Sequence, residues 1–275
     1  MSNTNPPDDS DITRRRLLQV TGGTVGLAGL GSTSAAGAVS AGTDSNAGTR
    51  CPEATFRPGI VHYDDSIRTV CSDGHPKTDS LQSGVRTSLE DRFPTVGSLI
   101  DAGFVPYFDF FSEGTWSHWV NPDWIGDDSV LDPDRPESVI VDHTWWRPIG
   151  VMFIATAGGD PVDPPPTIYR DGGDACMPWH AHVGLPGRYA WWKYQTVWGT
   201  ESGLRCRTPW MLHVWKYSSP ESVYAHGPPA DRGGPPAESP GFDTDADPGA
   251  EELGPEHLPD AVRDEVAGLW LSSVW

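Results

Sequence analysis

Five short runs of β-branched and aromatic residues, separated by glycine, proline and aspartate, restrict the folds open to this chain. Their sequences are FVPYFDFF, SVIVDHTW, IGVMFIAT, YAWWKYQTVW and WMLHVWKY. Runs of this length and composition are typical of strands that pair across turns. The chain also contains 27 prolines and 31 glycines, which place much of the remainder in turns. We therefore predict a mainly β domain, built as an antiparallel β-sandwich or an open barrel.

Signals for helices are few. Residues 88–91 (SLED) and residues 94–102, which precede a glycine, each indicate a short helix. Near the end of the chain, residues 257–275 place apolar side chains at close to helical spacing. The β domain should therefore carry one or two short helices and a C-terminal helix that packs on its body.

Differences in composition divide the chain into segments. Residues 39–50 are rich in glycine, serine and threonine and form a linker, and residues 51–226 form the β-rich core domain. Residues 227–256 are rich in proline, glycine and acidic side chains and cannot bury a core of their own. We expect this acidic segment to be disordered or to form a long crossing over the surface, ahead of the C-terminal helix at 257–275.

The N-terminal segment has the features of an export signal. Arg14 and Arg15 precede a stretch of glycine, alanine, leucine and valine at 22–30, which is followed by small residues at 36–38. This pattern resembles a twin-arginine translocation signal, which exports folded proteins, often with a cofactor in place. We predict a signal peptide over residues 1–38, recognised by the twin-arginine export machinery. The product would be secreted or at the cell surface, without membrane attachment after processing; an uncleaved N-terminal anchor is the alternative.

The charge of the chain indicates its surroundings. The net charge is −19, and only three of the 19 basic residues are lysines. An acidic surface with little lysine stays soluble at molar salt, where charges are screened to within ~3 Å. The same charge excludes nucleic acid and anionic membranes as partners, because both require basic patches. We therefore predict a secreted halophilic protein.

The four cysteines all lie in the exported part of the chain, at positions 51, 71, 176 and 206. An even number in an exported protein favours disulfide bonds formed in an oxidising compartment. Four cysteines allow three pairings, of which we prefer Cys51–Cys71 with Cys176–Cys206. The second bridge would join two segments that carry histidines. A thiolate of Cys176 as a metal ligand is the competing interpretation, and the even count makes it the weaker one.

Three histidines form a candidate metal site. His180 and His182 occur in CMPWHAH, and His213 follows in PWMLHVW. In an extended segment, alternate residues lie on the same face about 7 Å apart, so the first two could share one ion. The same alternation places His213 on a face with Met211 and Trp215. A buried imidazole must be hydrogen-bonded or bound to a metal, and three converging imidazoles would suit Zn²⁺, Cu²⁺ or Fe²⁺.

Two family resemblances bear on these histidines. Their spacing is cupin-like, but no glutamate follows His182 at the distance at which cupins have one. A larger part of the chain, about residues 89–226, resembles an uncharacterised family of secreted bacterial and archaeal proteins. The matching phrases are FPTVGSLIDAGFVPYFDFF, GTWSHWVNPDWIGDDSVLDPDRPESVIVD, RPIGVMFIA, PWHAH and WMLHVW.

The resemblance to this secreted family implies one more site residue and no reaction. That residue is His118, in the phrase TWSHWVNP. It would serve as a fourth ligand or as an acid or base beside the three-histidine centre. The alternative is a histidine in a turn that caps backbone groups ahead of Asn121 and Pro122.

The sequence lacks the motifs of the common hydrolases, kinases, dinucleotide-binding proteins, zincins and thioredoxins. The leading interpretation is therefore an exported metal-binding β protein with a histidine-rich centre, whose reaction the sequence does not indicate. The alternative is a non-enzymatic cell-surface binding or structural module without a metal. Its partner would be a carbohydrate or a protein, because some of the 13 tryptophans could stack on sugar rings.

Overall fold

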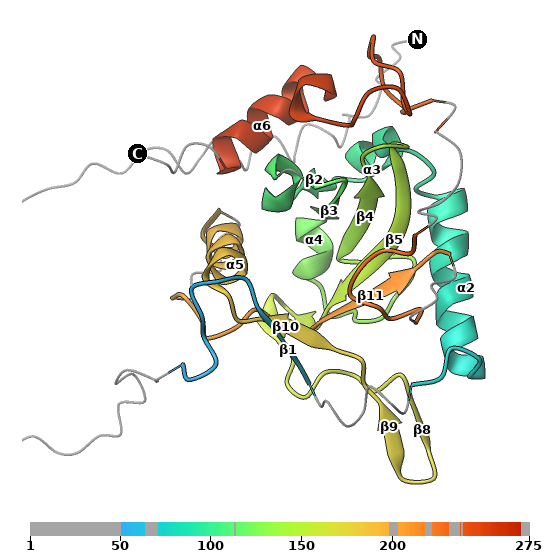
Figure 1. Cartoon of the computed structure of the whole chain (residues 1–275), viewed down its shortest axis with the longest axis vertical. Coiled ribbons are helices and arrows are strands. Elements are labelled where there is room, and N and C mark those ends of the chain that lie inside the picture. The colour runs from blue at the N-terminus through green and yellow to red at the C-terminus, as the bar shows by residue number, and fades with distance from the viewer. Residues whose placement is uncertain are drawn as a thin grey trace, which may run out of the picture. The chain divides into compact units, whose positions relative to one another are not determined.

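A seven-stranded antiparallel sheet forms the centre of the molecule (Figure 1), with the strand order β1-β10-β11-β5-β4-β3-β2. The computed structural model describes residues 51–63, 71–112, 114–197, 203–217, 222–230, 237 and 239–270. The predicted signal with Arg14 and Arg15 and the predicted linker at 39–50 lie outside these residues. The mainly β, antiparallel fold is confirmed, and the sheet is open and does not close into a barrel.

Three of the five aromatic runs supply the central strands of this sheet, as predicted. The seven strands are β1 (Ile60–His62), β2 (Val105–Pro106), β3 (Trp116–Val120), β4 (Ser138–Asp142), β5 (Arg147–Ile154), β10 (His180–His182) and β11 (Met211–Trp215). Two small sheets pair β6 (Thr156–Ala157) with β7 (Asp160–Pro161) and β8 (Tyr169–Asp171) with β9 (Asp174–Cys176). The run FVPYFDFF forms only β2 before it turns into a short 3₁₀ helix, η2 (Phe108–Phe111).

The helices are α2 (Pro76–Asp91), α3 (Val96–Asp101), α4 (Pro122–Ile125), α5 (Leu185–Val197) and α6 (Asp260–Trp270), with a 3₁₀ turn, η3 (Pro255–His257). The prediction of a strand for YAWWKYQTVW is wrong, because residues 189–197 of this run lie in α5. Trp191 and Tyr194, three positions apart, share the buried face of that helix. Burial of this face overrides the strand preference of aromatic residues.

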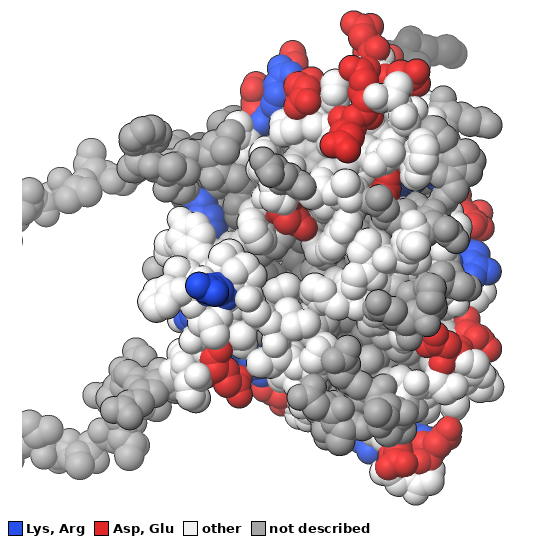
Figure 2. Space-filling model, viewed as in Figure 1, with Lys and Arg blue, Asp and Glu red and all other residues white. Residues whose placement is uncertain are grey.

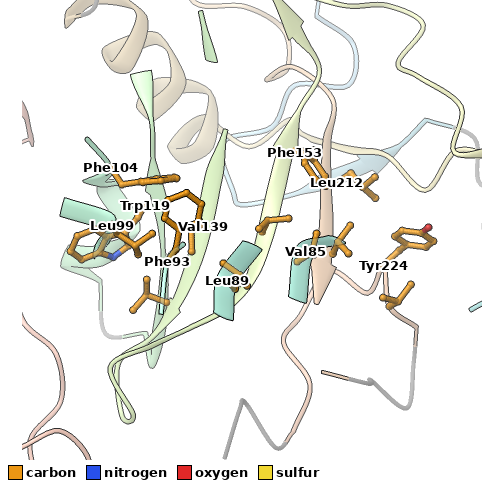
Figure 3. Close-up of a cluster of buried hydrophobic side chains, with 14 of the residues drawn as sticks. Val85, Leu89, Phe93, Leu99, Phe104, Trp119, Val139, Phe153, Leu212 and Tyr224 are labelled. Atoms are coloured by element: carbon orange, nitrogen blue, oxygen red, sulfur yellow. The ribbon is translucent and has the colours of Figure 1, made fainter. Parts of the chain in front are cut away.

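Alternate residues of the central strands pack in two separate cores. Leu212 and Val214 of β11 belong to one core, which also contains Val85 and Leu89 of α2; Figure 3 labels Val85, Leu89 and Leu212 among the side chains of this core. Met211 and Trp215 of β11 belong to the second core, together with Trp191 and Tyr194 of α5. The alternation predicted for β11 is confirmed, and it places His213 on the α5 face of the sheet.

The acidic segment and the C-terminal helix contact the core. Leu253 belongs to the buried core that also contains Val85 and Leu89, and the indole Nε1 of Trp146 donates to the carbonyl oxygen of Glu251 at 2.8 Å. Val262 and Val266 of the predicted C-terminal helix, α6, are also buried in this core. Figure 2 shows acidic side chains gathered over this segment and near the β8–β9 hairpin. The apolar contacts anchor a segment whose composition alone gives little reason for it to pack.

Close packing of Gly97 against this segment gives a first prediction. The Gly97 amide donates to the carbonyl oxygen of Pro240 at 2.8 Å, and a Cβ atom at position 97 would overlap the backbone of Gly241. Alanine is favoured over glycine within a helix by ~1 kcal/mol, so only this overlap should make Gly97→Ala unfavourable. We expect the free energy of unfolding to fall by about 1–3 kcal/mol, and residues 227–256 to be cleaved faster in limited proteolysis.

The matched control for this prediction is Gly74→Ala, where no heavy atom lies within 4 Å of the added Cβ. It should leave both the unfolding free energy and the cleavage rate nearly unchanged. Equal behaviour of the two variants would show that the acidic segment does not press against α3.

Candidate metal centre

Five histidines converge on the α5 face of the sheet. His180 and His182 come from β10, His213 from β11 and His118 from β3, while His226 lies in the loop after β11. The ring of His180 is the centre of the group. Its centroid lies 4.8 Å from that of His226, 5.0 Å from that of His213 and 5.6 Å from that of His182.

His180, His182 and His226 form a compact group of three within this cluster. Each offers one ring nitrogen, and the three nitrogens lie within 4.8 Å of one another. Among the residues that the structure describes, this is the one group of three or more histidine, cysteine or acidic side chains so arranged. Two nitrogens on one ion, with bonds of about 2.1 Å, lie about 3–3.5 Å apart. Small inward rotations of the three rings would therefore bring them to bonding distance.

The Nε2 atom of His180 is buried and has no hydrogen-bond partner among the described residues. Leaving a buried nitrogen unpaired costs about 1–3 kcal/mol, and such atoms are rare in native proteins. A metal ion beside His180 would supply the missing partner.

Burial and mutual repulsion favour the neutral form of His180, His182 and His213. Burial is the main cause that lowers the pKa of His180 and of His213 well below the usual value, and neighbouring histidines lower it further. Burial, with repulsion from His226 and His118, lowers the pKa of His182 to about 4. Neutral imidazole is the form that binds a metal, so near pH 7 these rings can bind without first losing a proton.

His118 and His213 form a second arrangement within the cluster. Nδ1 of His118 lies 2.7 Å from Oδ2 of Asp109, and Nδ1 of His213 lies 2.8 Å from the backbone oxygen of His226. Carboxylate and carbonyl oxygens only accept here, so each Nδ1 carries the proton and donates it. The two Nε2 atoms face each other at 3.2 Å. Histidines that bind metals are usually held in this way through the nitrogen that does not bind.

Two cavities border the cluster. The larger, of about 280 Å³, is lined by His118, His182 and His226 and by mainly apolar side chains that include Tyr107 and Trp116. The smaller, of about 240 Å³, is lined by His226, His180 and residues of the loop after β11. Because His226 borders both cavities, a small molecule could approach the compact trio from either side.

The structure brings all four predicted ligands into one cluster, but not into one compact group. His180 and His182 lie together as predicted, whereas His118 and His213 pair with each other beside them. The alternative of a capping turn for His118 is wrong, because this residue lies in the middle of β3. The side chain of Asn121 takes the capping role by accepting from the amides of residues 123 and 124.

His226 is the member of the cluster that sequence reasoning missed. It lies outside any strand or helix, in a loop whose composition gives no periodic signal. Its position depends on how the chain returns after β11, where the amide of Trp215 donates to the carbonyl oxygen of Val223 at 3.2 Å. Its separation of 13 residues from His213 does not fix its position, because an extended chain of this length spans about 43–47 Å.

The predicted disulfide pairing is wrong. The bridges are Cys51–Cys206 and Cys71–Cys176. The reason is the antiparallel pairing of β1 with β10, which no pattern in the sequence indicates. The segment before β1, with Cys51, therefore lies near the end of β10, where it meets Cys206, and Cys71 pairs with Cys176, which precedes β10. Because Cys176 is in a disulfide, the competing interpretation of a thiolate metal ligand is also wrong.

Comparison with family models, curated proteins and solved structures gives no match. None of the helices in the described ranges is long and apolar enough to cross a membrane. The two disulfides fit an oxidising environment outside the cytoplasm. What this chain does must therefore be inferred from the chemistry of the histidine cluster.

Proposed function

We propose that this chain is an exported metal-binding protein of a halophilic organism, with an ion held by His180, His182 and His226. The observation that carries the proposal is the buried Nε2 of His180, which has no hydrogen-bond partner among the described residues and lies in a compact group of three imidazoles. Three imidazole donors suit Zn²⁺, Cu²⁺ or Fe²⁺, and are a poor set for Ca²⁺ or Mg²⁺, which prefer oxygen.

Three protein ligands would leave a coordination position open for water or a small molecule. Such an ion would supply Lewis-acid chemistry to whatever occupies that position, and copper or iron would also supply redox chemistry. The cavity of about 280 Å³ beside His182 and His226 gives a small molecule access, and its mainly apolar lining favours an apolar one. The protein part of the site would bind this molecule, exclude water around it and hold the ligating rings.

Three properties of the chain support export into a salty medium. Arg14 and Arg15 stand in a twin-arginine pattern, the net charge is −19, and the described cysteines are all in disulfides. The twin-arginine machinery carries folded cargo, so a metal could be inserted before export. An ion acquired in this way would not depend on the metal content of the external medium.

Metal analysis of protein purified at high salt tests the proposed function. We expect the wild type to hold at least one transition-metal ion per chain. His180→Ala and His226→Ala should each remove one equivalent and weaken binding at this position by at least about 100-fold, because even the loss of a residue that only orients a ligand costs 10–100-fold. His257→Ala serves as the matched control, since this histidine packs on Trp146 outside the cluster and should leave the metal content unchanged. A wild type that is folded but metal-free would refute the proposal.

Two exposed aromatic side chains favour the second candidate function, a surface module that binds carbohydrate. Phe56 is 87% exposed and Tyr189 is 44% exposed, whereas Trp119, Trp146 and Trp179 are fully buried. Sugar stacking by this module would therefore use Phe56 and Tyr189 rather than the buried tryptophans. Retention of the wild type on immobilised polysaccharide, lost in Phe56→Ala while the metal content stays the same, would favour this candidate.

A further inference from the structure

We infer that the cluster has a second cation position, formed by His118 and His213. This inference deepens the proposed function and rests on it for the first ion, at His180, His182 and His226. The ligand would be a late first-row divalent ion that accepts imidazole, such as Zn²⁺ or Cu²⁺.

The first step of the argument concerns protons. Both Nδ1 atoms of the pair are committed as donors, to the Asp109 carboxylate at 2.7 Å and to the carbonyl oxygen of His226 at 2.8 Å. A neutral imidazole carries only one proton, so both Nε2 atoms present lone pairs. These lone pairs face each other at 3.2 Å, which is repulsive unless a positive charge lies between or beside them.

The second step concerns distance. Two imidazole nitrogens bound to one ion at about 2.1 Å are separated by about 3–3.5 Å. The 3.2 Å between the Nε2 atoms of His118 and His213 falls within this range without any movement of the rings. The trio is more open, with nitrogens up to 4.8 Å apart. The pair is thus the part of the cluster already at the spacing of ligands on one ion.

The third step shows that His118 and His213 form a position distinct from that of His180, His182 and His226. Within the described parts of the chain, neither His118 nor His213 joins a group of three donors as compact as His180, His182 and His226. The pair therefore defines a position of its own. His118 and Asp109 also line the larger cavity, which supplies room for the water or ligand atoms that complete the coordination.

Asp109 is the positioning residue for this second site. Its carboxylate accepts from Nδ1 of His118 and also from the backbone amide of His118, at 3.2 Å. This double contact fixes the ring and makes its Nε2 a better electron donor. With two protein ligands against three, and with repulsion from the first ion, the second ion should bind more weakly than the first.

The test is calorimetric titration of metal-free protein with ZnCl₂ at high salt, with circular dichroism to confirm the fold of each variant. We expect two equivalents for the wild type, and one each for His118→Ala and His180→Ala. Asp109→Asn should keep two equivalents but raise the Kd of the weaker one by about 10–100-fold. Because Asp109 and His118 are only partly buried and line a cavity, both variants test the pair without opening the buried core at His213.

The other outcomes overturn the inference in distinguishable ways. One equivalent in the wild type and also in His118→Ala would mean that the pair shares a proton, with His118 charged beside Asp109, while the proposed function stands. One equivalent in the wild type and none in either histidine variant would mean a single ion shared by the whole cluster. No binding by folded wild type would end both the inference and the proposed function.

Discussion

Acidifying the metal-free protein from pH 7 to pH 4 is expected to lower its free energy of unfolding by several kcal/mol. Burial lowers the pKa of His182 from 6.5 to about 4, so the folded protein leaves this ring neutral where the unfolded chain protonates it. Its contribution to stability is complete above pH 6.5 and is lost as the pH falls toward 4. That difference corresponds to ~3 kcal/mol for this residue alone. His180 and His213 shift in the same direction and add to the loss.

One buried group works in the opposite direction. Burial raises the pKa of Glu137, so the folded protein holds a proton that the unfolded chain loses above pH 4.5. The cost of burying Glu137 is therefore relieved as the pH falls. Protonation of other carboxylates also reduces repulsion within a chain of net charge −19, which likewise favours the folded protein at lower pH. The histidine contribution must therefore be isolated by a difference between two proteins.

His182→Gln provides that difference, because glutamine does not titrate. Urea unfolding of wild type and variant is measured with both proteins stripped of metal and held at constant salt. The advantage of the wild type in free energy of unfolding should shrink by ~3 kcal/mol from pH 7 to pH 4. Parallel curves would show that His182 titrates normally in the folded protein. With zinc present, the wild-type curve should fall more steeply, because protonation of the ligands also releases the ion.

The sequence predicts the parts of the fold that follow local pattern. β4, β5 and β11 arise where β-branched runs are long enough to pair, and α6 arises where apolar residues recur at helical spacing. α5 does not follow its local preference, since the burial of Trp191 and Tyr194 against the sheet decides its conformation. Tertiary packing outweighs a propensity difference that is below 1 kcal/mol per residue.

Some features of the candidate site also follow from local sequence, whereas others depend on tertiary structure. The common face of His180 and His182 follows from strand alternation, which is a local property. The approach of His118 to His213 does not, because β5 and β4 lie between their strands in the sheet. The two rings nevertheless meet across these strands, with their Nε2 atoms 3.2 Å apart, and no local pattern in the sequence indicates this. The inclusion of His226 and the disulfide pairing likewise depend on where β1 and the loop after β11 lie, and no short stretch of sequence determines this.

Removal of the Cys71–Cys176 bridge should have the largest effect on stability of any change considered. It closes a loop of 105 residues, and a loop of about 100 residues is worth ~4.7 kcal/mol in the chain-entropy description. Cys71→Ala with Cys176→Ala should therefore lower the free energy of unfolding by about 5 kcal/mol, and somewhat more because Cys176 is fully buried. Denaturant unfolding at fixed salt measures this loss.

The matched control is Cys51→Ala with Cys206→Ala, which removes a bridge across 155 residues. Because the entropy depends only on the logarithm of loop length, this pair should cost nearly as much, without the added cost of a core cavity. An unchanged unfolding free energy in either double variant would mean that the corresponding bridge does not form in the native protein.

The size of these losses bears on export. A single domain is stable by about 5–15 kcal/mol, so a chain without either bridge should lie close to its unfolding midpoint. A twin-arginine substrate must nevertheless fold before it reaches the oxidising compartment. An ion held by His180, His182 and His226 would stabilise the reduced chain by about 4 kcal/mol at a thousandfold excess over its Kd. Reduced wild-type protein should therefore be folded with zinc and largely unfolded without it, and His226→Ala should reduce the difference to the contribution of the weaker ion at His118 and His213.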